Sequence, residues 1–299
     1  MKYLVIAFLL LSLPTKKYEL GLNLKVGETY SQKIVGSMEM EQDVSGFTQK
    51  INTTMTGGMN YKVVQYENDQ YEMEVWYTQI GMEMDTGYAT MNFSSDSDDP
   101  DDPMSPFMKA LVDKPFNMSV HRSGTVKDIR GLSEIFSSLF DEYPEIPETE
   151  KAQITAQLQE SYGDKALRGN MEMLLAIYPS EAVAIGDHWN NEINIGAGME
   201  MVIKNDFSLT EVTGEHITIS GISEIGNSGE STQLSGMDAS FSMKGQMDST
   251  IKIDPKTNWI LEATIVQNIT GTISLAESPQ VPGGMDVPFT MIQRMNVED

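Results

Sequence analysis

Most of this chain alternates apolar and polar residues with the period of two that is typical of β-strands. Tyr61–Tyr66 and Tyr71–Tyr77 are two such runs, and the turn-forming tetrad Glu67–Gln70 separates them. Phe116–Val120 and Val126–Ile129 flank a second short turn in the same way. Strand-forming residues on both sides of a short polar turn are typical of a β-hairpin. The alternation therefore predicts an antiparallel, mainly β fold.

Residues 132–178 change to the period of an α-helix. Three apolar groups recur there at helical spacing, and Pro144, Pro147 and Pro179 separate or end them. The groups are Ile135, Phe136, Leu139 and Phe140; Ile154 and Leu158; and Leu167, Met171, Leu174, Leu175 and Tyr178. Each helix would be amphipathic, so each needs an apolar surface to pack against. We therefore predict a helical insert of two to three helices over residues 132–181.

The strand pattern after the insert repeats the pattern before it. Val26–Tyr30 and Ile185–Trp189 both read aliphatic residue, Gly, acid, any residue, aromatic. Three further pairs of segments match in the same order: 38–40 with 199–201, 64–73 with 209–219, and 116–126 with 247–260. An ordered set of matches indicates an internal duplication. It predicts two related curved antiparallel β units, or one long sheet folded on itself, half-barrel-like in shape.

The predicted α+β organisation is one compact domain with three parts after the leader. Residues 18–131 form a first β repeat with an acidic loop at 94–103, residues 132–181 form the helical insert, and residues 182–299 form a second β repeat. We expect the helices to fill the concavity of the sheet or to cover one face. In each Met-Glu-Met sequence, Met should face the core and Glu should face water.

The first residues predict export. Met1-Lys2 is a short basic start, and Tyr3–Leu13 is an unbroken apolar run of 11 residues. A membrane-spanning helix needs about 20 such residues, so this run fits the apolar region of a signal peptide at residues 1–17. A buried N-terminal strand is the alternative. No later run reaches spanning length, so the expected location is periplasmic, cell-surface or secreted.

Composition excludes several classes of function. The chain has 44 Asp and Glu against 20 Lys and Arg, a net charge of −24, and no Cys. Without Cys there are no disulfides, thiolate metal sites or cysteine nucleophiles. The negative charge opposes binding to nucleic acid and to anionic lipid surfaces.

The stretch Tyr178–Trp189, which contains Pro179 and Ile185-Gly186-Asp187-His188-Trp189, resembles a family signature of the Val-Gly-Asp-x-Trp type. That family consists of exported proteins, chiefly from Bacteroidota, whose domain has no known function. Residues 94–103 and 116–131 resemble the same family. The resemblance implies export and supplies no activity. Many members carry a lipid-anchoring Cys that this chain lacks, and the β-rich build resembles the half-barrel carriers of lipids and lipoproteins in the periplasm.

Methionine is unusually frequent, with 22 residues, and Met-Glu-Met occurs at 38–40, 82–84, 171–173 and 199–201. On a strand, the two Met of each pair point the same way, so paired thioethers could bind Cu(I). The alternatives are that Met fills irregular core space or lines an adaptable apolar pocket. The pair at 171–173 falls on a predicted helix, where the two side chains diverge, and this disfavours copper.

Other sites for chemistry lack their patterns. Asp96, Asp98, Asp99, Asp101 and Asp102 have the density of a Ca²⁺ loop without its Gly and late Glu, so a solvated loop is favoured. His121, His188 and His216 have no zinc-binding spacing. Ser249–Lys252 has the Ser-x-x-Lys spacing, but the stretch reads as a strand rather than a helix. Carboxylate pairs for glycoside hydrolysis lack a recognisable aromatic cleft. We expect no enzyme activity, no metal and no cofactor.

The predicted function is binding of an apolar ligand, such as a lipid or another hydrophobic small molecule, between the curved sheet and the helices. The expected lining is Phe136, Leu139, Phe140, Leu167, Met171 and Leu174. The same residues could instead close a solid core. An alternative function is an interaction or structural module that uses an acidic β face to engage a basic protein partner or a cell-surface polymer.

Overall fold

The computed structural model describes residues 16–99, 104–140, 146–196, 200–227, 231–234, 237–279 and 281–299. The predicted signal peptide lies almost entirely outside the described residues. Four helices are described, namely α1 (Ser105–Leu111), α2 (Leu132–Ser138), α3 (Glu148–Tyr162) and α4 (Asp164–Leu175). The strands before the insert are β1 (Thr29–Val44), β2 (Phe47–Glu67), β3 (Gln70–Asp85), β4 (Thr90–Ser94), β5 (Phe116–His121) and β6 (Val126–Arg130). Those after it are β7 (His188–Gly196), β8 (Glu200–Val212), β9 (Ile217–Asn227), β10 (Ser231–Leu234), β11 (Met237–Ile253), β12 (Ile260–Leu275) and β13 (Met285–Glu298).

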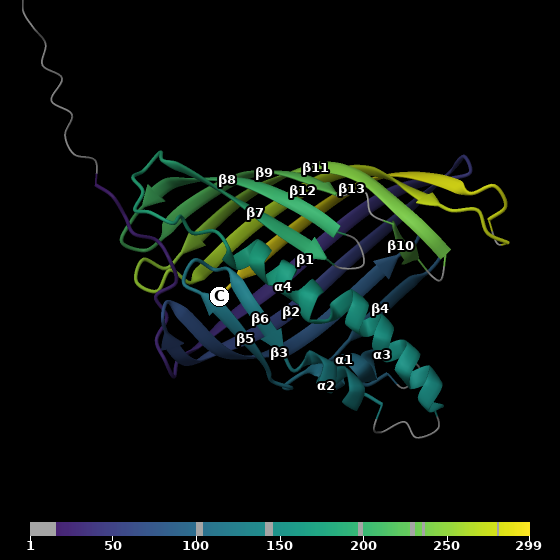
Figure 1. The fold of residues 1–299 in the computed structure, drawn as a ribbon, viewed down its shortest axis with the longest axis horizontal. Helices are drawn as coiled ribbons and strands as arrows, with labels where there is room; N and C mark the ends of the chain where they lie inside the picture. The colour runs from purple at the N-terminus through teal and green to yellow at the C-terminus, as the bar shows by residue number, and fades with distance from the viewer. Residues whose placement is uncertain are drawn as a thin grey trace, which may run out of the picture.

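All of these strands belong to one curved antiparallel sheet of 13 strands (Figure 1). Its order is β6-β5-β3-β2-β1-β13-β12-β11-β9-β8-β7, with β4 added on β3 and β10 added on β11. Strands β6 and β7 do not pair, so the sheet stays open between them. The mainly β prediction is confirmed, in its form of one long sheet folded on itself. The first and last strands, β1 and β13, pair at its centre.

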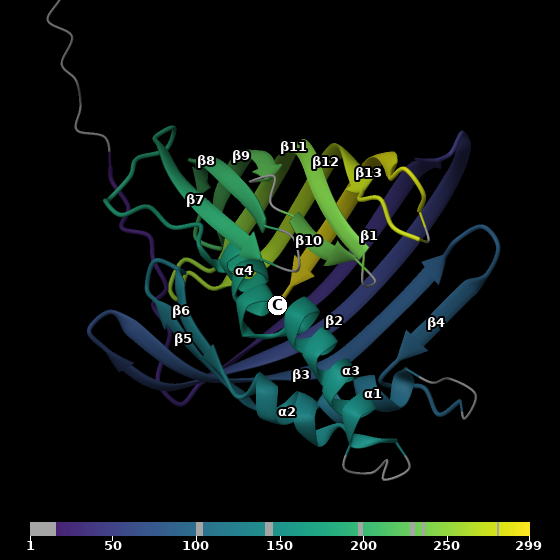
Figure 2. The same cartoon turned by 45° about the vertical axis from the view of Figure 1, so that its right-hand side comes forward.

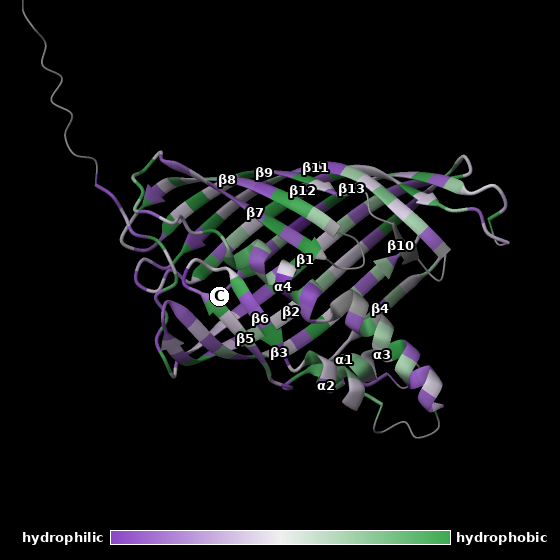
Figure 3. Cartoon of the chain, in the orientation of Figure 1, coloured by the Kyte–Doolittle hydropathy of each residue, from purple (hydrophilic) through white to green (hydrophobic). Residues whose placement is uncertain are grey.

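Met-Glu-Met alternates on β1 and β3 as predicted. On both strands the Met residues are half-buried and the Glu between them is exposed. Glu39 lies on the convex face, where the Arg294 guanidinium donates to its carboxylate at 2.8 Å. The banding of polar and apolar residues along the strands is visible in Figure 3. Because strand side chains alternate, the acidic residues of these strands stay in water while the thioethers turn inward.

The helices lie on the concave side of the sheet (Figure 2). Helices α2, α3 and α4 form the predicted insert, whereas α1, which follows the acidic loop, was not expected. Helix α4 packs against both β6 and β7 and so bridges the two unpaired edges of the sheet. Helix α3 packs mainly against α2 and α4. The insert therefore closes one end of the concave side with α4 as its inner layer.

Helix α4 ends at Leu175, three residues before the predicted end at Tyr178. Side chains of β7 donate hydrogen bonds to the backbone carbonyls that follow the helix. The Asn191 amide donates to the Ala176 carbonyl, and the Trp189 indole N–H donates to the Ile177 carbonyl at 3.0 Å. Tyr178, which the pattern placed on the helix, lies beyond it and donates its hydroxyl to the Asn258 carbonyl. These strand contacts end the helix before Pro179 can do so.

The N-terminal segment crosses the closed end of the sheet and joins its two halves. Its Leu20, Leu22 and Leu24 are buried. The Leu22 N–H donates to the Arg122 carbonyl in the β5–β6 turn at 2.8 Å. The next residue, Asn23, donates its N–H to the Thr257 carbonyl in the β11–β12 turn at 2.8 Å.

The two halves share a local geometry at the start of β1 and of β7. The Gly27 N–H donates to the Val63 carbonyl at 2.8 Å, and the Gly186 N–H donates to the Leu209 carbonyl at 2.8 Å. Both glycines have positive φ, 89° and 91°, which favours Gly at this turn. The two hairpins that follow carry a register shift just after Val63 and just after Leu209.

The cross-strand registers agree as well, because Tyr30 pairs with Tyr61 and Trp189 pairs with Phe207. Strands β1 and β2 thus correspond to β7 and β8. One of the four matches is wrong, since residues 38–40 lie in β1 whereas Met201 lies in β8, the counterpart of β2. A Met-Glu-Met tripeptide recurs on any Met-rich alternating strand, so it does not mark equivalent positions.

Candidate ligand-binding face

The six predicted lining residues are all buried in one continuous core. Phe136 is on α2, Leu139 and Phe140 follow it, and Leu167, Met171 and Leu174 are on α4. Phe140 packs against Phe107 of α1, with ring centroids 5.6 Å apart. The structure buries all six within this core, on α2 and α4 and at the end of α2. Their role in ligand binding stays a prediction, and their burial favours the alternative that they close a solid core there.

Helix α4 is fixed to the sheet by polar contacts as well as by packing. The Val126 N–H at the start of β6 donates to the Glu172 carboxylate at 3.1 Å. Burial raises the pKa of this carboxyl, while Arg168 and the Val126 N–H lower it. Met171 and Met173 point to different partners, as expected for a helix: Met171 Sδ accepts from the Tyr61 hydroxyl at 3.6 Å, and Met173 Sδ accepts from the Gln267 amide at 3.4 Å.

Away from the insert, the concave side presents a half-exposed apolar surface at the opposite end of the sheet. We call it the Met-lined face. It comprises the inward-facing apolar side chains of β1 to β4 with one from β13, namely Met38, Met40, Ile51, Met55, Met82, Met84, Met91, Phe93 and Met291.

The strand register joins these residues into rows across five strands. One row runs through Met295, Gly36, Met55, Met82 and Phe93. The next runs through Gln293, Met38, Thr53, Met84 and Met91, and a third through Met291, Met40 and Ile51. Directly opposed side chains on one face lie about 5 Å apart, so the apolar side chains of a row are neighbours except where Gly36 interrupts the first row and Thr53 the second.

Exposure changes along the strands that carry these rows. Under the insert, the inward-facing Met59, Tyr61 and Met73 are fully buried. Farther along the same face, Met55 is 49% exposed and Met91 is 39% exposed. The same face thus passes from a packed core to a partly exposed apolar surface, which α1 borders through its contacts with β3 and β4.

One polar side chain lies within the Met-lined face. Thr53 sits between Met38 and Met84 and is buried, yet its Oγ1 has no hydrogen-bond partner within the described part of the chain. A buried hydroxyl without a partner loses the hydrogen bonds that it would make in water.

The convex side of the same strands is mostly polar. Glu41 pairs with Lys50, and Glu74 pairs with Lys62 at 3.5 Å. The convex side of these strands carries only scattered exposed apolar residues, such as Val35, whereas the concave side carries a group of neighbouring ones. An extended patch of this kind is the usual mark of a surface that binds something apolar.

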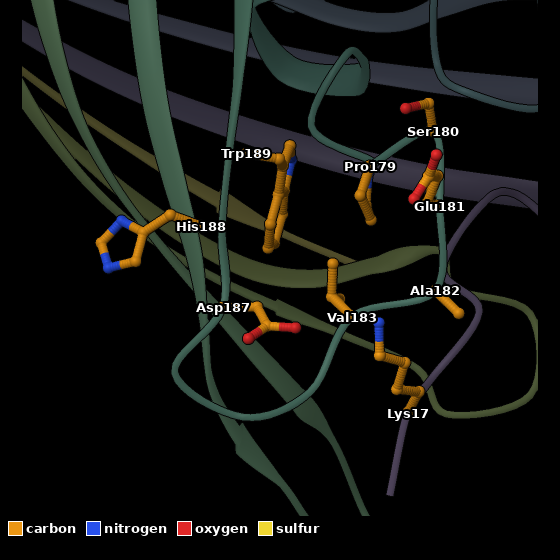
Figure 4. Close-up of a pocket in the computed structure, with 9 residues that line it drawn as sticks. All are labelled: Lys17, Pro179, Ser180, Glu181, Ala182, Val183, Asp187, His188 and Trp189. Carbon is orange, nitrogen blue, oxygen red and sulfur yellow. The ribbon is translucent and has the colours of Figure 1, made fainter. Parts of the chain in front are cut away.

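The family signature lies elsewhere, beside an open pocket of about 330 Å³ at the start of β7 (Figure 4). Its lining residues are Lys17, Pro179, Ser180, Glu181, Ala182, Val183, Asp187, His188 and Trp189. Asp187 accepts the Ala184 N–H at 2.9 Å, and Trp189 packs on Phe207. The imidazole of His188 turns away from the pocket and lies 3.0 Å from Asp206. The signature therefore builds the turn into β7 and brings together no set of groups for chemistry.

The other candidate sites stay dispersed. Within the described ranges no group of three or more His, Asp or Glu side chains could hold a metal ion. Of the acidic run, Asp96 accepts from Gln79 at 2.7 Å and Asp98 pairs with Lys109 at 2.8 Å, while Asp101 and Asp102 lie outside the described residues. The hydrogen bond from the Lys109 ammonium, together with its positive charge, lowers the pKa of the Asp98 carboxyl below its ordinary value.

The Ser-x-x-Lys spacing is a coincidence, as the strand pattern predicted. Ser249 and Lys252 both lie on β11 and occupy opposite faces of the sheet. Lys252 pairs with Glu262 at 2.8 Å on the convex side, while Ser249 is buried on the concave side.

The sequence pattern identified the direction of the Met side chains but missed this face as a site. The signal was present in the two Met-Glu-Met pairs of β1 and β3, together with Met55 on the strand between them. What the pattern could not show is which part of the concave side the helices leave uncovered.

Comparisons with known proteins give one family and no close relative. The sequence profile described as "Family of unknown function (DUF6263)" matches residues 68–260. No curated protein matches this chain. No helix in the described ranges is long and apolar enough to cross a membrane.

Solved structures match only at low similarity. A lipovitellin structure, described as showing lipid–protein interactions, is 9% identical with a TM-score of 0.48, and the match covers 92% of this chain and 25% of that one. This chain thus spans about a quarter of the lipovitellin chain. An outer-membrane channel from Pseudomonas putida F1 is 6% identical with a TM-score of 0.27, covering 92% and 97% of the two chains. TM-scores this low support no functional argument. The profile match, by contrast, spans more than half of the chain and includes the Ile185–Trp189 signature, so this protein belongs to the family of unknown function DUF6263.

Proposed function

We propose that this protein is an exported, non-enzymatic binding protein that holds the apolar chain of a lipid or a similar amphiphile on the Met-lined face. The observation that carries the proposal is the group of neighbouring apolar side chains that stay half-exposed on the concave side while the convex side of the same strands is mostly polar. The ligand would lie beside the insert, with its chain extending the packed core under α4. The end of the apolar chain would then contact the buried core that contains the six predicted lining residues.

Burial of the ligand's methylene groups gives enough free energy for measurable binding. Each methylene that leaves water contributes about 0.8 kcal/mol. Ten buried methylenes would therefore contribute about 8 kcal/mol before the cost of immobilising the ligand, which corresponds to a dissociation constant in the micromolar range or weaker.

The choice of methionine supports a ligand that varies in shape. A Met side chain is unbranched, flexible and polarizable, so a surface of Met adapts to different chains at little cost. A core that packs only against itself gains more from the fixed shapes of Leu and Ile.

Two neighbouring residue pairs on β2 and β3 allow a matched test. Met55 pairs with Met82 on the concave side, and Thr54 pairs with Glu83 on the convex side. We expect the double variant Met55→Gln, Met82→Gln to lose about tenfold or more in affinity for cis-parinaric acid, a fluorescent 18-carbon fatty acid, because two apolar contacts become polar. Fluorescence titration measures the change.

The control variant Thr54→Gln, Glu83→Gln should bind the probe like the unmodified protein. Ionic strength separates this proposal from the acidic-face module, since apolar binding should persist in 1 M salt whereas binding through the −24 charge should weaken. An equal loss in both double variants, or the absence of any saturable binding, would overturn the proposal.

A further inference from the structure

Two hairpin turns at the same end of the sheet are built alike. In the β1–β2 turn, Asp43 accepts the Gly46 N–H at 2.7 Å, and Phe47 follows the glycine. In the β3–β4 turn, Asp85 accepts the Gly87 N–H at 2.8 Å, and Tyr88 follows the glycine. Both glycines have positive φ, 86° and 76°, so each turn is fixed by an Asp cap and a left-handed Gly.

The aromatic side chains of these turns are the most exposed large apolar residues within the described ranges. Phe47 is 79% exposed and Tyr88 is 91% exposed. A single exposed apolar residue needs no explanation, but two exposed aromatics on similarly built turns at the same end of the sheet form a repeated feature. Rigid turns hold both rings in water at a cost that a compact fold would otherwise avoid.

The turns adjoin the Met-lined face. Phe47 occupies the same face of β2 as Ile51 and Met55, because odd-numbered residues of this part of β2 point inward. Tyr88 lies just before Met91, which is itself on the Met-lined face. Both hairpins project from the end of the sheet opposite the N-terminal segment (Figure 2). On the inward face of β2, Gln49 lies between Phe47 and Ile51 and accepts a hydrogen bond from Gln42 at 2.9 Å. The tips and the Met-lined face are therefore neighbours with one polar pair between them.

We propose that Phe47 and Tyr88 dock this end of the protein on a zwitterionic lipid bilayer, so that an acyl chain passes from the bilayer onto the Met-lined face. This proposal rests on the proposed function and identifies where the ligand comes from. Aromatic side chains favour the interface between lipid headgroups and hydrocarbon, where Phe inserts and Tyr keeps its hydroxyl in the polar layer.

The charges around the tips select the kind of bilayer. Asp43 and Asp85 flank the aromatics, and the nearby cation Lys50 is paired with Glu41. With a net charge of −24, the protein is repelled by anionic headgroups. Docking should therefore be strongest on neutral phosphatidylcholine. Two inserted aromatics give only weak, reversible attachment, which is what a protein that leaves with its ligand requires.

Vesicle sedimentation with the full-length mature chain tests the proposal. The variant Phe47→Ser, Tyr88→Ser should bind phosphatidylcholine vesicles about tenfold or more weakly than the unmodified protein. The control is Val26→Ser, Ile185→Ser, which removes two exposed apolar side chains, 58% and 55% exposed, at the other end of the sheet. This control should sediment like the unmodified protein. Replacing part of the phosphatidylcholine by phosphatidylglycerol should weaken binding.

Two further readouts keep the outcomes distinct. The tip variant should keep its affinity for cis-parinaric acid in solution, which separates failure of docking from failure of ligand binding. The variant Tyr88→Trp should show a blue shift of its added fluorescence when vesicles are present. Equal vesicle binding by the tip variant and its control would overturn docking while leaving ligand binding intact. A change in oligomeric state of the tip variant without loss of vesicle binding would instead identify a second copy as the occupant.

Discussion

At the scale of single residues, the tightest contact between insert and sheet is made at a glycine. Gly124 lies in the β5–β6 turn with a φ of 83°, and a Cβ added there would come within 1.6 Å of the Leu175 carbonyl oxygen. The turn therefore approaches the end of α4 so closely that no side chain fits. Gly27 has a similar φ of 89° but open space around its Cβ position. A comparison of Gly124 with Gly27 therefore separates the effect of a steric clash from the effect of backbone conformation.

Substitution of these two glycines by alanine should have unequal effects. We expect Gly27→Ala to cost about 1 kcal/mol of unfolding free energy, because an L-residue is strained at positive φ. Gly124→Ala should cost about 3 kcal/mol or more, because the end of α4 must also move away from the turn. Urea unfolding at equilibrium measures both values. Equal losses would show that the turn and the helix are not in contact.

At the scale of elements, α4 is the piece that holds the open edges of the sheet together. Glu172 fixes it to β6, and the segment after it is fixed to β7 by Asn191 and Trp189. The Glu172 carboxylate is half-buried, and burial raises its pKa above the ordinary value. The contact between α4 and β6 is therefore sensitive to pH.

The direction of this pH dependence follows from proton binding. Because the pKa of Glu172 is higher in the folded state than in the unfolded state, the folded state binds more protons between the two values. The contribution of this group to the unfolding free energy therefore falls as the pH rises through that window. Glu172→Gln keeps an acceptor for the Val126 N–H and carries no charge. The variant should lose this component, and its stability relative to the unmodified protein should be greater at pH 7 than at pH 4.

Chemical denaturation of both proteins at a series of pH values gives the difference directly. Glu83→Gln, at an exposed position on the convex side of β3, is a suitable control for the loss of one acidic group. A stability difference for Glu172→Gln that is constant with pH, or that changes in the opposite direction, would contradict the described burial of Glu172.

The elements were predictable where their cause is local. Alternation predicted the hairpins, helical spacing predicted the insert, and the shared Gly turns predicted the correspondence of Val26–Tyr30 with Ile185–Trp189. Helix α4 ends early because side chains of β7 donate hydrogen bonds to the Ala176 and Ile177 carbonyls, which follow it. Helix α1 was missed because its sequence follows directly after the acidic, proline-rich loop. Such long-range contacts leave no local pattern.

At the scale of the whole molecule, the chain closes on itself at three places. Strand β1 pairs with β13, residues 18–24 tie together two turns from different halves, and α4 bridges β6 and β7. All three joins involve residues distant in sequence. They lie at the closed end or along the centre of the sheet, so the opposite end of the concave side is left with its apolar rows uncovered.

For the same reason, the candidate site was predictable only in part. The inward direction of Met38, Met40, Met82 and Met84 follows from the period of two. The lining predicted from the helices, such as Phe136 and Leu174, marks the part of the concave side that the insert covers. Which part stays open depends on where α2, α3 and α4 rest on the sheet, and this is a property of the assembled fold.

Methyl NMR of the methionines tests the central claim most directly. With [13C-methyl]methionine incorporated, a fatty acid carrying a nitroxide on its chain should broaden the signals of Met38, Met40, Met55, Met82, Met84 and Met91. The signals of Met73 and Met118, buried at the closed end, should stay sharp, because Met73 lies ~30 Å along β3 from Met82. Broadening of Met73 and Met118 with unaffected signals from the Met-lined face, or no broadening at all, would contradict binding of an apolar chain on that face.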